Sequence, residues 1–116
     1  MSLTLYGLNK CSTCVKARQW LDAHGVVHTF VDYRDNPVAP EKLKAWAESL
    51  GGWEKLVNRA SMTWRNLPAE RKTPETAEQW LALIAEFPAL VRRPVAENAD
   101  AVSVGFSEKA YTARFS

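Results

Sequence analysis

The sequence lacks long apolar runs. None approaches the ~20 consecutive apolar residues that a membrane-spanning helix needs, so we expect no membrane partner. Residues 1–9 contain neither a basic segment nor a long apolar segment behind it, which predicts that no secretory signal is present. The expected location is therefore cytoplasmic.

Cysteine and histidine are also scarce, and the net charge is small. The 116 residues include two cysteines and two histidines, with no second C-x-x-C pair and no H-x-H pair. Because structural zinc takes four ligands, these few cysteines and histidines predict that the protein has no metal site. We also expect no bound cofactor. The net charge of +2 is too small for the basic surface that nucleic acid requires, so no direct nucleic-acid partner is expected.

The first third of the chain is patterned as strand, helix and strand. Residues 3–7 are short and partly alternating, and residues 26–33 are rich in β-branched and aromatic side chains. Between them, a turn at 9–13 opens into a helix that we expect to end near His24, with Gly25 as its stop. A strand–helix–strand unit of this kind predicts parallel strands with a right-handed crossover.

The middle of the chain is patterned as helices. Pro40 suits the first turn of a helix that stops at Gly51-Gly52, and residues 53–57 predict one or two further helical turns. We expect Thr73-Pro74 to cap another helix, which Pro88 ends. Trp46 and Trp80 lie on the apolar stripes of these helices, so both are predicted to be core residues.

The last third predicts two strands and a helix. The strands are expected at 89–95 and 101–105 with a hairpin turn at 98–100, and Ser107 is expected to cap a helix from Glu108 to about Arg114. The order βαβ then ββα is the thioredoxin-like α/β arrangement with a mixed four-stranded sheet. We predict one domain over 1–116, with a core at 1–35 and 88–116 and a helical insert at about 36–87.

The two cysteines form a C-x-x-C pair between the first strand and the first helix. Cys11 falls at the helix N-terminus, where free N–H groups and the helix dipole stabilise a thiolate. The neighbouring Lys10 favours the same charge. Cys14 follows one turn later, ~5 Å away along the helix, within reach of a disulfide. In a reducing compartment such a pair is more often catalytic or metal-binding than structural. The alternative is a pair of small half-buried apolar residues, but the position between a strand and a helix of a βαβ unit favours a redox or nucleophilic role.

Four segments resemble the arsenate-reductase-like ArsC/Spx family, most closely its YffB branch. The first segment runs from Leu5 to Ala17, and its last two residues begin the run Lys16-Ala17-Arg18-Gln19-Trp20-Leu21. The other three segments are Leu56–Arg65, Phe87–Pro94 and Gly105-Phe106-Ser107. The resemblance runs through nearly the whole chain in the family's order. It implies a thioredoxin-like fold with an inserted helical subdomain, Cys11 as the nucleophile, Arg93 as an anion-binding residue over the site, and Pro94 as a cis-proline facing the cysteine.

The sequence departs from the arsenate reductases of this family at two points. The arginine of the middle motif falls on Ala60, with Arg59 as its neighbour, and a further arginine is replaced by the segment Gly105-Phe106-Ser107. A tetrahedral oxyanion is best held by several guanidinium groups. These substitutions argue against efficient arsenate reduction, which stays the third of the candidate functions.

The first candidate function is a glutathione-linked thiol-disulfide or oxyanion reductase. Its predicted catalytic residues are Cys11, Cys14 and Arg93. Its predicted substrate- or glutathione-binding residues are Lys10, Ser12, Thr13, Arg59, Arg92 and Pro94. Glutathione is the expected co-substrate, and it or Cys14 would resolve the adduct on Cys11.

The second candidate function is a redox-sensing transcriptional regulator. The resemblance extends to Spx-like regulators, which carry a C-x-x-C switch and act by binding the RNA polymerase α subunit. In that case a disulfide between Cys11 and Cys14 would alter an interaction surface instead of completing a catalytic cycle. The pair of cysteines favours the regulator, whereas the Trp64-Arg65 and Gly105-Phe106-Ser107 segments favour the YffB branch.

Overall fold

The computed structural model describes residues 3–98 and 101–115 and divides into two compact units. The sheet unit comprises the described residues up to Asn36 and from Arg93 onward, and the helical unit comprises Pro37–Arg92. The division falls one residue after the expected start of the insert and five residues after its expected end. The assignment of 1–116 to a single domain stays a prediction. No helix within the described ranges is long and apolar enough to cross a membrane.

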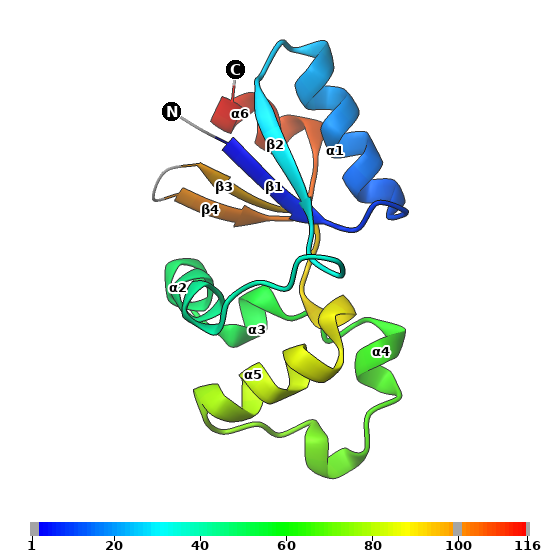
Figure 1. Ribbon diagram of the computed structural model, residues 1–116, viewed down its shortest axis with the longest axis vertical. Helices are drawn as coiled ribbons and strands as arrows, with labels where there is room; N and C mark the ends of the chain where they lie inside the picture. Colours follow the sequence, from blue (N-terminus) through cyan, green and yellow to red (C-terminus); the bar gives the residue numbers. More distant parts are fainter. Residues whose placement is uncertain (1–2, 99–100, 116) are drawn as a thin grey trace. The chain divides into compact units, whose positions relative to one another are not determined.

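The sheet unit has the thioredoxin-like topology that the sequence predicts (Figure 1). Its elements are β1 (Leu3–Gly7), α1 (Ser12–Ala23), β2 (His28–Asp32), β3 (Val95–Asn98), β4 (Ala101–Val104) and α6 (Glu108–Phe115). The strand order is β2-β1-β3-β4, with β2 parallel to β1 and the other neighbours antiparallel. The mixed four-stranded sheet is thus confirmed, and β1 lies between the strands on either side of the chain's large insert.

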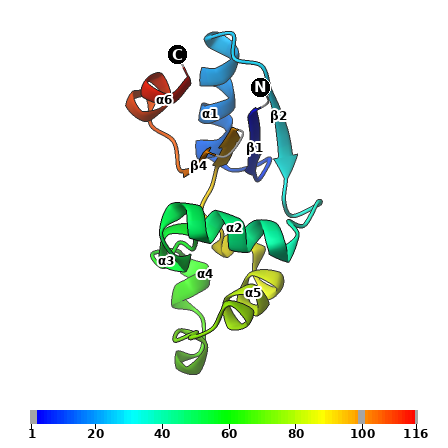
Figure 2. The same ribbon diagram turned by 90° about the vertical axis from the view of Figure 1, so that its left-hand side faces the viewer.

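Both helices of this unit cover one face of the sheet (Figure 2). Leu3 and Leu5 of β1 point to that face because alternate residues of a strand share a side, and they pack against Ala17 and Leu21 of α1. Tyr111 of α6 is fully buried among these residues. The apolar stripe of α1 predicted from the sequence, which includes Cys14, is therefore the stripe that faces the sheet.

Two strand predictions in this unit need correction at their starts. The second strand begins at His28, because Gly25 adopts a positive φ of 69° and the Val26 N–H is bonded to Leu21 O in the turn that ends α1. The strand expected at 89–95 is a 3-10 turn, η2 (Pro88–Leu90), followed by β3 from Val95. Of the predicted hairpin turn, Ala99 and Asp100 lie outside the described residues.

The helical unit is built around tryptophan. Its elements are α2 (Pro40–Leu50), α3 (Trp53–Leu56), α4 (Met62–Arg65), η1 (Ala69–Arg71), α5 (Ala77–Glu86) and η2. Trp46 and Trp80 are buried as predicted. The Trp80 ring stacks between Trp53 and Trp64, with centroid distances of 6.2 and 5.9 Å. An antiparallel β-bridge between Val57 and Val91 joins the residue after α3 to the residue after η2.

The helix that contains Trp80 begins later than predicted. Thr76, and not Thr73, is its N-cap, because the Thr76 hydroxyl accepts from the Gln79 N–H at 3.2 Å. The Gln79 side chain in turn accepts from the Thr76 N–H, which completes a capping box. The short helix α4, capped by Ser61, has no counterpart in the sequence-based expectations because four residues are too few to show a helical period.

Candidate active site

The loop that carries the first cysteine is fastened at the carboxyl ends of β1 and β2. Gly7 closes β1 opposite Asp32 of β2. The Asp32 carboxylate accepts from the Asn9 N–H at 3.0 Å and from the Arg34 N–H at 2.8 Å. The Cys11 N–H is bonded to Leu8 O at 3.1 Å. These bonds fix the path of the backbone between β1 and α1, so the position of Cys11 is set by the sheet.

Cys11 is the N-cap residue of α1 and is partly exposed. Its side chain makes no conventional capping hydrogen bond, but its surroundings favour a thiolate. Partial burial raises the pKa of Cys11, whereas the backbone N–H groups of Cys14 and Thr13 and the side chains of Cys14 and Arg93 lower it. The lowering contributions prevail, and the pKa of Cys11 lies below that of an ordinary thiol. The expected activation of this sulfur by the helix N-terminus thus has a counterpart in the structure.

Cys14 is buried, with 1% of its surface exposed. Burial raises the pKa of Cys14 to about 12, and the adjacent Cys11 charge acts in the same direction. Cys14 therefore stays a thiol that donates to the Cys11 sulfur. Its own sulfur fills the space beside Gly7, where a Cβ atom would lie 2.5 Å from it. Only glycine leaves that space open, so the last residue of β1 is fitted to the second cysteine.

Arg93 and Pro94 approach the cysteines from the start of β3. The Arg93–Pro94 peptide bond is cis, as the resemblance implied. Pro94 is buried, and its carbonyl accepts from the Gly105 N–H at 2.9 Å. The half-buried Arg93 side chain donates to Cys11 and to Tyr33, and these two partners raise its pKa although burial lowers it. A permanently charged guanidinium thus lies against the reactive sulfur.

The remaining predicted residues are distributed over both units. Thr13 contributes its backbone N–H to the Cys11 sulfur, whereas Lys10 and Ser12 are exposed beside it in the sequence. Arg59 and Arg92 belong to the helical unit, and both are exposed. The contacts found in the sheet unit therefore join Cys11, Cys14, Thr13 and Arg93.

Sequence reasoning missed two residues of this group, Tyr33 and Asp32. Tyr33 is 3% exposed and bonded through its side chain to Arg93, and Asp32 holds the loop before Cys11. A signal for both was present, because parallel strands bring their carboxyl ends to one edge of a sheet, where ligand sites gather. The residues that end the second strand therefore belong to the same candidate site as those that end the first.

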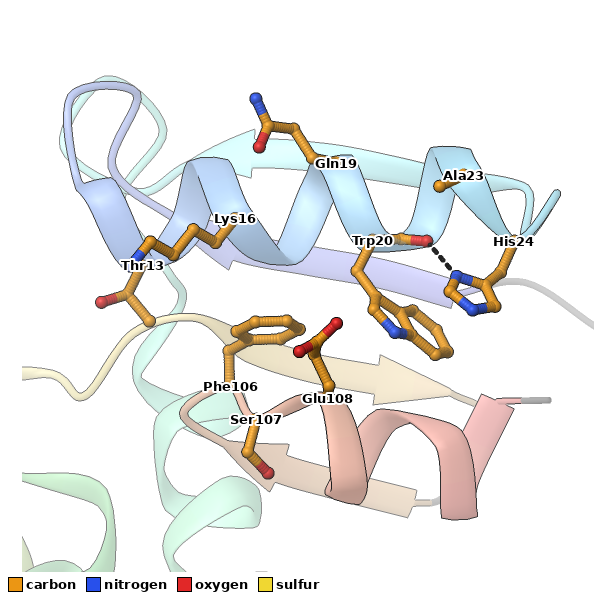
Figure 3. Close-up of a pocket in the computed structure, with 9 residues that line it drawn as sticks. All are labelled: Thr13, Lys16, Gln19, Trp20, Ala23, His24, Phe106, Ser107 and Glu108. Atoms are coloured by element: carbon orange, nitrogen blue, oxygen red, sulfur yellow. Dashed lines mark hydrogen bonds between the residues drawn. The ribbon is translucent and has the colours of Figure 1, made fainter.

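An open cleft lies between α1 and the beginning of α6 (Figure 3). It has a volume of about 680 Å³ and begins at Thr13. Trp20 points into it from α1, and Phe106 and Glu108 point toward α1 from the opposite wall. His24 closes its far end by stacking on Trp20 at 3.9 Å. Thr13 is the one residue shared by this cleft and the contacts around Cys11.

Within the described residues, no group of three or more histidine, cysteine or acidic side chains is arranged to hold a metal ion. The groups that the structure brings together at the site are the two sulfurs and the Arg93 guanidinium. An activated thiolate, a neighbouring buried thiol and an anion-stabilising arginine suit nucleophilic attack on an oxidised sulfur or an oxyanion.

Comparison with known proteins places this arrangement in a family. The ArsC family model matches residues 6–114. The chain belongs to the ArsC family. An uncharacterised protein of Haemophilus influenzae is 38% identical over 113 residues, which cover 97% of this chain and 98% of that protein. The solved structure of the YFFB protein has a TM-score of 0.90 at 35% identity and covers 99% of this chain and 100% of that one.

A second kind of relative is a regulator. The global transcriptional regulator Spx 1 of Lactococcus lactis is 28% identical over 107 residues, 91% of this chain and 83% of the regulator. The relatives of this chain thus include a protein named for regulation, and the chain has the ArsC family's thiol-reductase-like, thioredoxin-type fold. The predicted family, its YffB relationship and the fold class are confirmed.

Proposed function

We propose that this protein is a glutathione-linked thiol reductase whose nucleophile is Cys11. The observation that carries the proposal is the environment of the Cys11 sulfur, in which two backbone N–H groups, the Cys14 thiol and the Arg93 guanidinium lower its pKa. A thiol activated in this way reacts as a thiolate near neutral pH. The family membership supports the same class of chemistry.

In the first step the Cys11 thiolate attacks one sulfur of a disulfide substrate. A bond forms between Cys11 and that sulfur, the substrate S–S bond breaks, and the second sulfur leaves as a thiolate that takes a proton from water. Arg93 stabilises the negative charge on Cys11 before attack and holds a carboxylate of glutathione. Arg93 remains charged throughout because its pKa is raised.

The second step resolves the mixed disulfide. Once Cys11 has lost its negative charge, burial remains as the main cause that raises the pKa of Cys14 and the charge contribution of Cys11 is gone. In this proposal Cys14 then gives its proton to water and attacks the Cys11 sulfur. The substrate then leaves as a thiol and a Cys11–Cys14 disulfide remains. Two glutathione molecules supply the two electrons that return both cysteines to thiols, and they leave as oxidised glutathione. In a shorter alternative, glutathione instead of Cys14 attacks the mixed disulfide directly.

The other predicted residues take supporting roles in this proposal. Lys10, Ser12 and Thr13 border the sulfur in the sequence and are proposed to contact substrate or glutathione, as is Pro94. Arg59 and Arg92 are proposed to add positive charge for an anionic substrate. The exposure of Lys10, Arg59 and Arg92 leaves these cations available to bind such a substrate.

The test exposes the reduced protein to oxidised glutathione between pH 5 and pH 9 and maps the products by intact mass and peptide analysis. We expect a Cys11–Cys14 disulfide in the wild type and a stable glutathione adduct on Cys11 in Cys14→Ser, both forming readily below pH 7. Cys11→Ser is the matched control, because it keeps the buried Cys14 thiol and should form no adduct.

Two results would contradict the proposal. One is reaction of Cys11 only above pH ~8.5, the value of an ordinary thiol. The other is full thiol-transfer activity in Cys11→Ser.

Arg93→Ala should react with glutathione more slowly than the wild type, and equal rates would remove Arg93 from the mechanism.

The relative in Lactococcus lactis favours a second candidate function. A regulator of this kind would use the Cys11–Cys14 pair as a redox switch and bind the RNA polymerase α subunit. The test is a pull-down with the C-terminal domain of that subunit, using protein that is fully reduced and fully oxidised. Binding that differs between the two states supports the regulator, and no binding in either state removes it.

Arsenate reduction is the third candidate. Ala60 stands where the resemblance places an arginine, and its exposed neighbour Arg59 belongs to the helical unit. We therefore expect arsenate-dependent oxidation of glutathione to stay at the background rate. A rate above background that requires Cys11 would assign this activity to the protein.

A further inference from the structure

The strand register places two residues on opposite sides of the carboxyl end of β1. In β2, Asp32 pairs with Gly7, so Tyr33 lies just beyond that end. In β3, which runs antiparallel to β1, Val95 pairs with Tyr6, so the residues before Val95 also pass that end. Arg93 is among them. Tyr33 and Arg93 therefore both lie just beyond the end of the central strand that leads to Cys11.

Tyr33 is anchored more firmly than a residue that follows a strand usually is. Its N–H donates to Gly7 O at 3.1 Å, which extends the β1–β2 pairing past the last residue of β2. Its side chain is 3% exposed. A buried phenol needs a hydrogen-bond partner because leaving one unpaired is costly, and the Tyr33 hydroxyl accepts from the Arg93 guanidinium.

Arg93 therefore has two fixed partners, the Tyr33 oxygen and the Cys11 sulfur. A guanidinium is planar and carries five N–H donors in a rigid fork, so a bond at one side of the fork restricts where the other side points. The backbone beside it is held by the bond from Gly105 N–H to Pro94 O. That bond fixes the backbone next to Arg93, and the contact with Tyr33 restricts the long side chain.

We propose that Tyr33 is a positioning residue of the candidate active site, which holds the Arg93 guanidinium against the Cys11 sulfur. The proposal rests on the proposed function, because a positioned guanidinium matters only if Cys11 reacts as a thiolate. The titratable and charged groups that influence Cys11 and Arg93 are Cys14, Tyr33 and each other. Tyr33 itself stays a neutral phenol, since burial raises its pKa above the ordinary value.

The test measures the rate of Cys11 alkylation by iodoacetamide against pH in a Cys14→Ser background, which limits the reaction to one thiol. Tyr33→Phe removes the acceptor oxygen and keeps the ring. We expect its pH profile to move to higher pH, so that at a pH well below the midpoints of both profiles its rate is about threefold below that of the background protein. In Arg93→Ala, the further change Tyr33→Phe should have no effect.

The matched control is Tyr6→Phe. It removes a phenol oxygen of the same sheet that is bonded to Glu97 at 3.3 Å, at the end of β1 that leads to Cys11. Its profile should coincide with that of the background protein. Thermal unfolding of each variant shows whether the variant is still folded. Partial loss of the fold would change the alkylation rate but would not move the midpoint of the pH profile.

Two outcomes would overturn the proposal. One is a Tyr33→Phe profile that coincides with the background profile. The other is an equal shift in the presence and absence of Arg93, which would show that Tyr33 acts on Cys11 without Arg93. The unsubstituted profile tests the proposed function separately, since a midpoint at the value of an ordinary thiol contradicts that function whatever Tyr33→Phe does.

Discussion

The two compact units bury different kinds of side chain. The sheet unit buries Cys14, Tyr33, Tyr111 and Ser103 and half-buries Arg93. The helical unit buries only aliphatic residues and tryptophan, namely Leu43, Trp46, Ala47, Leu56, Val57, Trp64, Leu67, Trp80, Leu83, Ile84, Leu90 and Val91. Among the described residues, the buried side chains that can ionise therefore lie in the sheet unit, whereas the polar side-chain groups of the helical core are the indole N–H groups of its tryptophans.

This difference shows how the protein separates stability from chemistry. A buried thiol or phenol must have its polar atom satisfied or lose free energy, so each such group that lacks a partner lowers the stability of the core. Tyr111 illustrates the cost, because its hydroxyl has no hydrogen-bond partner among the described residues. Among the described residues, the core of the tryptophan-rich unit contains neither a thiol nor a phenol, and substitutions there should change stability without changing the sulfur.

Removing the central tryptophan of the helical unit is the change with the largest expected effect. Trp80→Ala deletes a ring that is 7% exposed and stacks with Trp53 and Trp64. We expect the free energy of unfolding to fall by about 3–5 kcal/mol, measured by urea unfolding followed by circular dichroism. The pH profile of Cys11 alkylation in native buffer should not change. A shifted profile would break the separation between packing and chemistry.

Adding one carbon at the end of β1 should affect both properties. In Gly7→Ala the new Cβ would lie 2.5 Å from the Cys14 sulfur, so the sulfur must move. We expect a loss of about 1–3 kcal/mol in the free energy of unfolding and a changed Cys11 alkylation rate. The double variant Gly7→Ala/Cys14→Ala should recover most of the loss, because the clashing atom is gone. Additive losses would contradict the contact.

Removing the cap of α5 sharpens the comparison within the helical unit. Thr76→Ala deletes the hydroxyl that accepts from the Gln79 N–H, and we expect a cost of about 1 kcal/mol in urea unfolding. Thr73→Ala is the matched control, since Thr73 is exposed and lies before the helix, and its effect should stay within about 0.5 kcal/mol. The reverse order of the two effects would place the cap at Thr73 after all.

The smallest expected effect is a pH dependence of stability due to Cys11. Its pKa is lowered on folding, so the folded protein loses this proton before the unfolded chain does. The resulting stabilisation is fully present above the pKa of an ordinary thiol, ~8.5, and is lost as the pH falls through the folded-state pKa. Urea unfolding of wild type and Cys11→Ser at several pH values should show a difference that grows from pH 5 to pH 8.5. Partial exposure of Cys11 keeps it small, and a difference that shrinks with rising pH would contradict the lowered pKa.

The candidate site shows how far the sequence could lead. The activation of Cys11 was predictable because it depends on a strand end and a helix start that are local in sequence. Arg93 and cis-Pro94 were reached only through the family resemblance. Tyr33 was missed because its contact with Arg93 depends on strands that are far apart in the chain and flank β1.

The sequence by itself determined the elements and their exposed faces. The stripe of α1, the stop of α2 at Gly51 and the start of the last helix after Ser107 all follow from residues within a few positions of one another. The tertiary structure decided which of two threonines caps α5, where β3 begins and which side chain holds Arg93. The physical reason is that periodicity and capping act over one helical turn, whereas a buried hydrogen bond between distant residues exists only after strand order and register have brought them together.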